Sequence, residues 1–157
     1  MIQVGDKIPD APLSIGTADG PQNTTTGEFF GGKKVVLFAL PGAFTPTCSA
    51  AHLPGYVVNA DQLKGKGVDT IACLSVNDAF VMNAWGEAQN AEEITMIGDG
   101  GGAFTKAVGL ELDTADFGGV RSQRYAMIVD DGTVTALNVE EPQQFEVSSA
   151  EAMLAAL

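Results

Sequence analysis

The stretch VVLFALPGAFTPTCS, residues 35–49, places a short apolar run directly before turn and helix-start signals. Residues 35–40 have the length and the branched apolar content of a strand that is buried on both faces. Pro41 and Gly42 then predict the turn that ends this strand. A helix is predicted to follow, so the stretch indicates a strand–turn–helix unit of the kind found in α/β proteins.

The predicted helix starts at Thr45, which has a side chain typical of an N-cap. Pro46 would then occupy the first helical position, where its missing N–H costs nothing, and Cys48 would occupy the third. The N–H groups of a first helical turn are unpaired and carry partial positive charge, so they favour the thiolate form of a cysteine placed there. Cys48 is therefore the first candidate for a reactive residue.

Strand and helix signals alternate along the rest of the chain, which predicts a single α/β domain over residues 1–157. Parallel strands are expected in the first half and an antiparallel hairpin, with its turn at 130–132, in the second. The predicted strands are 35–40, 69–76, 93–98, 124–129 and 133–139. The predicted helices are 27–30, 46–64 with a kink at Pro54, 77–90, 103–108 and 150–157, and a loop is predicted at 111–119.

The composition suits one globular domain, because 45% of the 157 residues are apolar and only 18% are charged. The net charge of −12 repels phosphate backbones and anionic lipids, which argues against nucleic-acid and membrane roles. No apolar run approaches the ~18 residues of a membrane span. The amino terminus has no signal-peptide pattern, so we expect a cytoplasmic protein with reduced thiols.

The two cysteines, Cys48 and Cys73, form no C-x-x-C pair. This spacing argues against a thioredoxin-type disulfide exchanger and against a zinc ribbon. Two cysteines in a chain of this length also exclude a disulfide-scaffolded fold. Cys73 lies in the middle of the predicted strand 69–76, where both faces should be covered, so it is expected to be a buried and inert thiol.

Several segments carry a family resemblance when they are taken together. They are PGAFTPTCS at 41–49, HLPG at 52–55, ACLSVNDAF at 72–80, Arg124 before Tyr125-Ala126-Met127, and ALNVE at 136–140. Over nearly its whole length the chain resembles the peroxiredoxins of the type II, peroxiredoxin-five-like subgroup. The resemblance implies a thioredoxin-like sandwich, in which helices flank a mixed central sheet, and no cofactor. It also implies a thiol-dependent peroxidase that reduces hydrogen peroxide and alkyl hydroperoxides.

The resemblance also implies roles for individual residues. Cys48 would be the nucleophile, whose thiolate attacks a peroxide oxygen and becomes sulfenic acid. The Thr45 hydroxyl would hold the thiolate and the peroxide, and Arg124 would stabilise the thiolate and polarise the peroxide. Backbone N–H groups near Thr47 and Cys48 would complete the cradle, and Pro41 would shield the sulfur from water.

Three further features have competing interpretations. Arg121, the only other arginine, either braces the site or adds to its electrostatics. His52 follows Cys48 by one helical turn, and a structural role beside the site is favoured over a Cys–His pair. A metal site would need more ligands, and none is expected. The glycine run at 98–102 lacks the ending of a phosphate loop and is interpreted as a strand-to-helix turn.

The segment 145–149 contains no cysteine, which departs from the two-cysteine pattern of relatives that carry a resolving cysteine near the C-terminus. Bridging Cys73 to Cys48 would require local unfolding, because a disulfide needs Cα atoms within ~7 Å. We therefore predict a one-cysteine cycle in which glutathione, alone or with glutaredoxin, reduces the sulfenic acid. The alternatives are a thioredoxin-resolved cycle through Cys73, and a peroxide sensor or holdase with little turnover.

Three aromatic residues, Phe44, Phe80 and Phe117, lie in predicted loops or helix starts near the site. If they are exposed, they would form the face of a homodimer, as type II relatives commonly have. If they are buried, they would belong to the core of the monomer. The sequence leaves both interpretations open.

Overall fold

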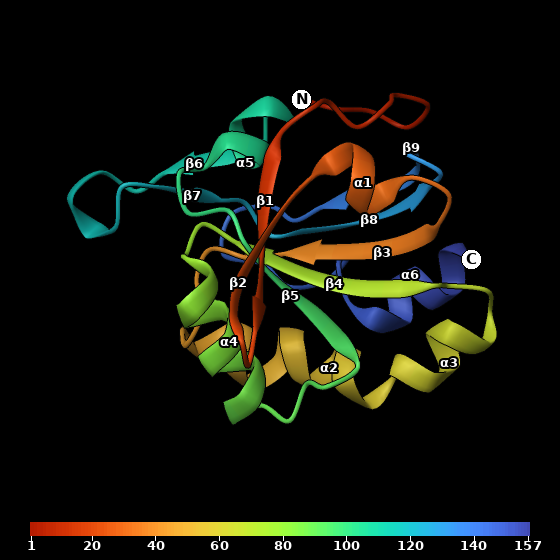
Figure 1. The fold of residues 1–157 in the computed structure, drawn as a ribbon, viewed down its shortest axis with the longest axis horizontal. Helices are drawn as coiled ribbons and strands as arrows, with labels where there is room; N and C mark the ends of the chain where they lie inside the picture. Colours follow the sequence, from red (N-terminus) through yellow and green to blue (C-terminus); the bar gives the residue numbers. More distant parts are fainter.

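The computed structural model describes all 157 residues, and a mixed seven-stranded sheet lies at its centre, in the order β2-β1-β5-β4-β3-β8-β9 (Figure 1). The strands of this sheet are β1 (Pro12–Thr17), β2 (Gly20–Thr25), β3 (Lys34–Ala39), β4 (Thr70–Ser75), β5 (Ile94–Gly98), β8 (Tyr125–Asp130) and β9 (Thr133–Val139). The helices are α1 (Thr26–Phe30), α2 (Leu53–Val58), α3 (Ala60–Gly65), α4 (Ala79–Ala88), α5 (Ala103–Ala107) and α6 (Ala150–Ala156).

Three parallel strands form the middle of this sheet. β3 pairs with β4 and β4 with β5 in parallel, whereas β8 runs antiparallel to β3 and forms a hairpin with β9. β3 is buried from Val35 to Ala39, which explains why its sequence is continuously apolar rather than alternating. The predicted arrangement of parallel strands from the first half and a hairpin from the second is confirmed.

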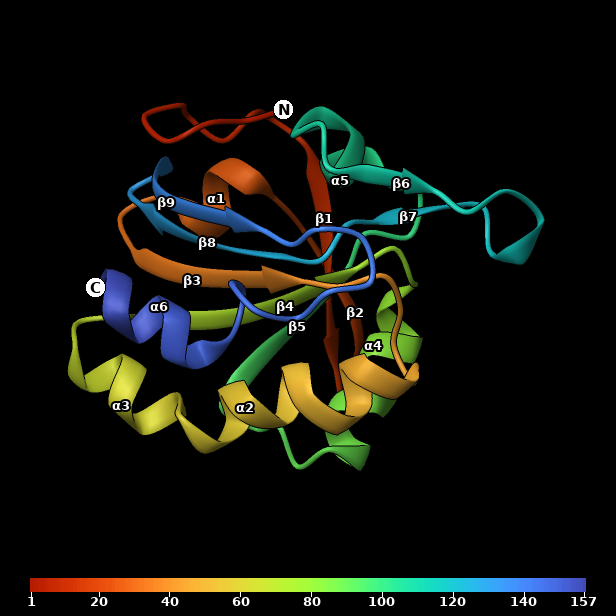
Figure 2. The same cartoon turned by 180° about the vertical axis from the view of Figure 1, so that it is seen from behind.

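The two faces of the sheet belong to separate cores. Phe38 points to the face that packs against apolar residues of α2, α3, α4 and α6. Leu37 points to the opposite face, which packs against α1 and α5. Figures 1 and 2 show these two helical layers from opposite sides. Cys48 and Cys73 both belong to the first core, so the two thiols lie on the same side of the sheet.

Two hairpins are missing from the sequence prediction. The β1–β2 hairpin turns at Ala18-Asp19, and its second strand, GPQNTT, is an edge strand without apolar alternation. The other hairpin pairs β6 (Glu111–Asp113) with β7 (Val120–Ser122) and lies partly in the predicted loop 111–119. Because β6 is short and exposed, it has no periodic signal. This hairpin projects from the sheet as an arm, defined here as residues 111–122 (Figure 1).

The prediction of one continuous helix over residues 46–64 is wrong, because the segment is interrupted twice. A π-helical turn spans Cys48–His52, where the Leu53 N–H donates to the Cys48 carbonyl five residues earlier. Asn59 then separates α2 from α3. Pro54 has no N–H to donate and its ring crowds the carbonyl four residues before it, so a regular helical ladder gives way beside it. The irregularity is therefore a wider turn ahead of Pro54.

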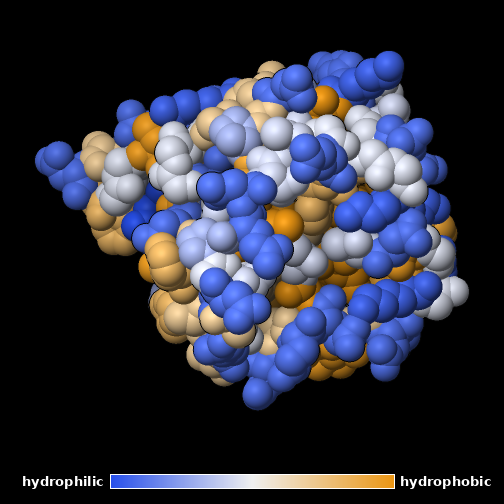
Figure 3. Space-filling model, viewed as in Figure 1, coloured by the Kyte–Doolittle hydropathy of each residue, from blue (hydrophilic) through white to orange (hydrophobic).

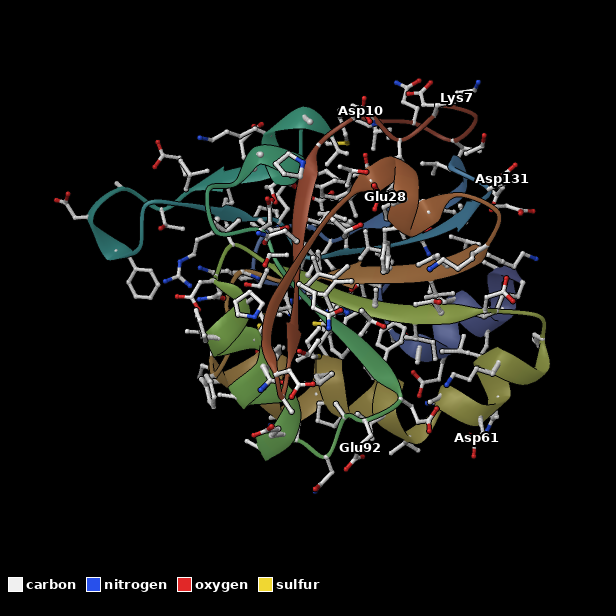
Figure 4. All side chains as sticks on the ribbon, in the orientation of Figure 1. Lys7, Asp10, Glu28, Asp61, Glu92 and Asp131 are labelled. Atoms are coloured by element: carbon white, nitrogen blue, oxygen red, sulfur yellow. The ribbon has the colours of Figure 1, made fainter.

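Most of the acidic side chains lie on the surface, whereas Asp99 and Glu140 are buried. Asp61, Glu92 and Asp131 project outward from different edges of the molecule (Figure 4). Hydrophilic residues cover most of the face shown in Figure 3, and the hydrophobic residues on it are scattered. The one ion pair joins Lys64 to Glu93, so most of the acidic side chains are unpaired. None of the helices combines the length and the apolar character that a membrane span requires.

Candidate active site

Cys48 lies in the first turns of the helical segment that follows β3, as the sequence predicts. The Ser49 N–H donates to the Thr45 carbonyl at 2.9 Å, so Thr47 and Cys48 belong to the first turn, where N–H groups carry partial positive charge. The Cys48 side chain is buried, with 1% of its surface exposed. The thiol is therefore held inside the protein rather than displayed on it.

Arg124 reaches this thiol from the neighbouring strand. The antiparallel register of β3 and β8 places Tyr125 opposite Ala39, so Arg124 lies beside the turn that leads from β3 to Cys48. Its Nη2 donates to Cys48 Sγ at 3.1 Å. A hydrogen bond from a charged donor such as a guanidinium is stronger than one between neutral groups. The sheet thus brings together two residues that are far apart in the sequence.

His52 occupies the other side of the Arg124 guanidinium. Arg124 Nη1 lies 2.8 Å from His52 Nδ1, and His52 Nε2 lies 3.0 Å from the Ser148 carbonyl oxygen. Because a guanidinium only donates, Nδ1 must accept, so Nε2 carries the proton and donates to Ser148. Burial and the nearby Arg124 charge lower the pKa of His52 to about 3. The imidazole is therefore neutral, and its favoured role beside the site agrees with its contacts.

The Thr45 hydroxyl has a different partner from the predicted one. Thr45 Oγ1 donates to the Gly42 carbonyl at 2.7 Å, and it does not cap the helix. The bond closes the turn between β3 and the helix, so local turn formation takes the hydroxyl that an N-cap would use. The oxygen lone pairs of this half-buried hydroxyl remain available to accept a hydrogen bond.

Arg121, at the base of the arm, supports the turn at Pro41. Arg121 Nη1 donates to the Pro41 carbonyl at 3.1 Å. A Cβ on Gly42 or on Gly118 would lie 2.4 Å from atoms of this guanidinium, so a larger residue at either position would displace the Arg121 side chain from this place. Phe117 packs over the guanidinium at 5.7 Å. These contacts agree with the bracing interpretation of Arg121.

A groove of about 580 Å³ adjoins the site. Its lining includes Pro41, Thr47 and Arg124, together with the segment 140–144 and Gln123. Three of the residues singled out from the sequence therefore border one hollow on the surface. The groove is large enough to admit more than a water molecule, and its lining mixes amide, carboxylate and proline side chains.

Comparisons with known proteins identify the family of this chain. Residues 3–154 match the family model described as Redoxin. Peroxiredoxin-2E-2, chloroplastic, of Oryza sativa subsp. japonica is 54% identical over 163 residues, which cover 99% of this chain and 72% of that protein. The chain belongs to the peroxiredoxin family. Like other peroxiredoxins, it is a peroxidase that uses a thiol.

Solved structures agree with the fold of this peroxiredoxin. Reduced Prx3 from Vibrio vulnificus, in complex with H2O2, is 68% identical with a TM-score of 0.97 over 99% of both chains. Peroxiredoxin 5 from Alvinella pompejana is 37% identical with a TM-score of 0.87, covering 99% of this chain and 97% of that one. The predicted thioredoxin-like peroxiredoxin fold is confirmed, as is the resemblance to the peroxiredoxin-five-like subgroup.

The second thiol of this peroxiredoxin, Cys73, is fully buried in the middle of β4 between Phe38 and Met96 of the flanking strands. Burial raises its pKa well above the ordinary value, and the negative charge of Cys48 adds to this, although Arg124 opposes it. A thiol that keeps its proton is a poor nucleophile. The structure therefore agrees with an inert Cys73 in the folded protein.

The three candidate aromatic residues are all exposed, with 57% of the surface of Phe44, 67% of Phe80 and 84% of Phe117 open to solvent. The interpretation that they belong to the monomer core is wrong. Phe44 has a φ of 64°, a conformation that is costly for a bulky residue. Its ring lies 6.4 Å from that of Trp85, whose Nε1 donates to Ser49.

One residue that the sequence interpretation missed is Glu140, at the end of β9. Its carboxylate accepts hydrogen bonds from the Ser148 hydroxyl and from the N–H groups of Glu146, Val147 and Ser148. Burial raises the pKa of Glu140, but these hydrogen bonds outweigh burial and hold the pKa below its ordinary value. No local pattern marks such a residue, because its partners belong to a non-repetitive segment.

We predict that the peroxiredoxin loses stability on acidification between pH 6.5 and about pH 3. The unfolded chain protonates His52 below its ordinary pKa of 6.5, whereas the folded protein does so only near pH 3. Unfolding therefore takes up a proton in this window, and the free energy of unfolding falls by about 1.4 kcal/mol per pH unit from this residue. Glu140, with its lowered pKa, acts in the same direction at lower pH.

Urea unfolding across this window provides the measurement, with the His52→Gln variant as the control. The variant has no imidazole to titrate, so its free energy of unfolding should depend less steeply on pH. Equal slopes for the two proteins would contradict the buried neutral imidazole.

Proposed function

We propose that this peroxiredoxin reduces hydrogen peroxide and alkyl hydroperoxides through Cys48. The observation that carries the proposal is the 3.1 Å hydrogen bond from Arg124 Nη2 to Cys48 Sγ. Two independent features therefore favour a thiolate at Cys48. One is the positive charge of the guanidinium, and the other is the place of the sulfur in the first turn of a helix. The similarity to Vibrio vulnificus Prx3, solved with H2O2, supports a peroxide as the oxidant.

In the proposed first step, the Cys48 thiolate attacks one peroxide oxygen and the O–O bond breaks. The attacked oxygen stays on the sulfur as sulfenic acid, and the other leaves as hydroxide or alkoxide and takes up a proton. Arg124 stabilises the charge as it moves from the sulfur to the leaving oxygen. The Thr45 hydroxyl, which donates to the Gly42 carbonyl, accepts a hydrogen bond from the peroxide O–H, and the N–H of Thr47 contributes to the cradle.

We further propose that Pro41 and Arg121 shape the site without contacting the reacting atoms. The Pro41 carbonyl receives Arg121, which holds the turn against the sulfur-bearing helix. The proline ring borders the groove and limits the access of water to the thiolate. The charge of Arg121 adds a weaker, more distant contribution to the positive field around the sulfur.

In the proposed second step, an external thiol resolves the sulfenic acid. The glutathione thiol attacks the sulfenic acid, which releases water and forms a mixed disulfide between glutathione and Cys48. A second glutathione or a glutaredoxin thiol then attacks this disulfide, which frees the Cys48 thiol and leaves a disulfide between the two reductant thiols. The burial of Cys73 and the lack of any other cysteine support this one-cysteine cycle. The alternative is a thioredoxin-dependent cycle in which Cys73 attacks first.

Peroxide consumption with each reductant separately tests the second step. We expect turnover with glutathione and glutaredoxin in both the native protein and a Cys73→Ala variant. Fast turnover with thioredoxin alone, lost in Cys73→Ala, would contradict the one-cysteine cycle and favour the alternative.

We also propose that the protein is a cytoplasmic homodimer. Reduced cysteines and a thiol reductant suit a reducing compartment. The exposed Phe44, Phe80 and Phe117 provide apolar surface for a partner copy near the site. A monomeric mass in sedimentation experiments would contradict the dimer.

A further inference from the structure

The segment 140–148 connects β9 to α6 (Figure 2), and the carboxylate of Glu140 at its start is hydrogen-bonded to residues 146–148 at its end. Glu140 is buried, with 7% of its surface exposed. Its carboxylate accepts hydrogen bonds from three successive N–H groups and from one hydroxyl. The distances lie between 2.7 and 2.9 Å. Asn138 adds a bond from its amide to the Val147 carbonyl. The backbone around Ser148 is therefore fixed in direction.

The Ser148 carbonyl oxygen is the point at which this segment meets the active-site helix. It accepts from His52 Nε2 at 3.0 Å and from the Tyr56 hydroxyl at 2.9 Å. Burial raises the pKa of Tyr56 well above its ordinary value, so this hydroxyl keeps its proton and remains a donor. With both donors in place, the carbonyl selects the imidazole tautomer that carries hydrogen on Nε2.

That tautomer leaves Nδ1 as an acceptor for Arg124 Nη1, while Nη2 of the same guanidinium donates to Cys48 Sγ. Phe145, in the same segment, covers both groups. Its ring lies 4.9 Å from the His52 ring and 5.9 Å from Arg124 Cζ. The planar guanidinium is thus held on one edge by His52 and on one face by Phe145, which leaves its other edge directed at the sulfur.

We propose that Glu140 and Ser148 are positioning residues for the peroxidase reaction, which act through His52 to direct Arg124 at Cys48. The proposal rests on the proposed function of Cys48 as the peroxide-reducing thiol. It extends the working site from the turn after β3 to a segment near the end of the chain.

The Glu140 carboxylate is not hydrogen-bonded to the guanidinium, although the backbones of the two residues are neighbours and the Glu140 N–H donates to the Arg124 carbonyl at 3.0 Å. A carboxylate bonded directly to Arg124 would compete with the Cys48 thiolate for its positive charge. Here the chain of hydrogen bonds from the carboxylate to Arg124 Nη1 passes through the Ser148 backbone and a neutral imidazole. The network orients the guanidinium firmly while its charge remains directed at the sulfur.

The test compares second-order rate constants for hydrogen peroxide in Glu140→Gln and Glu146→Gln. Both substitutions remove one negative charge from the same segment, but only Glu140 uses its carboxylate to hold the backbone, whereas Glu146 contributes only its N–H. We expect roughly a tenfold loss in Glu140→Gln and native activity in Glu146→Gln. Equal rates in the two variants would overturn the proposal.

A double-mutant cycle with His52 separates positioning from a general loss of structure. We expect His52→Leu to lower the rate constant roughly tenfold or more. His52→Gln keeps a hydrogen-bond acceptor and a donor, so it should retain most of the native rate constant. In the His52→Leu background, Glu140→Gln should cause no further loss, because its route to Arg124 is already broken. An additive loss, or equal rates for His52→Leu and His52→Gln, would overturn the proposal.

The native protein and Cys48→Ala are measured in the same assay. A native protein without Cys48-dependent peroxide reduction would refute the proposed function itself. Native activity together with an additive cycle would refute only the positioning role.

Discussion

Replacement of Cys48 by alanine is expected to abolish hydroperoxide reduction, whereas the same replacement at Cys73 should leave the reaction with peroxide unchanged. The two thiols lie in the same core and are both almost fully buried, so burial does not distinguish them. Their hydrogen-bonding does, because Arg124 donates to Cys48 and the protein gives Cys73 no such donor. Only the first sulfur has a partner that stabilises negative charge.

The measurement is the rate of peroxide consumption by the reduced protein in a single turnover, followed by mass spectrometry of the oxidised cysteine. Cys73→Ala is the matched control, and it should cost about 1 kcal/mol of stability without affecting this rate. Oxygen incorporated at Cys73 in the native protein, or a native rate in Cys48→Ala, would contradict the assignment.

The second large effect is expected from Arg124→Met, which should lower the rate constant for peroxide about a hundredfold to a thousandfold. Methionine retains much of the bulk of the side chain but removes the charge and both donors. The thiolate then loses its guanidinium, and the leaving oxygen loses the group that stabilises its charge. Arg124→Lys should recover only part of the rate, because one ammonium cannot reproduce the planar arrangement that joins Cys48 and His52.

Arg121→Met is the control for this second prediction, since it removes the same charge from the only other arginine. Arg121 contacts the Pro41 carbonyl rather than the sulfur, so we expect less than a tenfold loss. Similar losses in the two variants would show that overall positive charge, rather than the contact with Cys48, governs the rate. Thermal unfolding of each variant checks that the fold is intact.

The parts of the fold that the sequence predicts well are those whose burial leaves a pattern. β3 is covered on both faces and is apolar without interruption, and the turn at Pro41 and Gly42 follows from residues with strong local preferences. The β6 strand has no buried face and no such pattern. The sequence therefore does not distinguish β6 from a loop, and nothing in it indicates that β6 pairs with β7.

The same distinction applies to the site. The sequence singles out Cys48, Thr45 and Arg124 because they stand in recognisable segments, and the structure places Arg124 against Cys48. The partner of Thr45 was predicted wrongly, because a turn bond to Gly42 competes with helix capping over the same hydroxyl. Glu140 and Ser148 could not be found, because their role depends on where a non-repetitive segment returns to the sheet.

The almost complete burial of Cys48 has a consequence for selectivity. A charged, strongly nucleophilic sulfur on an open surface would react with many electrophiles in the cell, including bulky ones. With 1% of the surface of Cys48 exposed, we expect this sulfur to react only with molecules that are narrow where they meet it. The proposed hydroperoxide substrates meet this condition at their O–O group, and we expect a larger substituent to occupy the groove beside Arg124. Access, as much as reactivity, then decides which oxidants the protein removes.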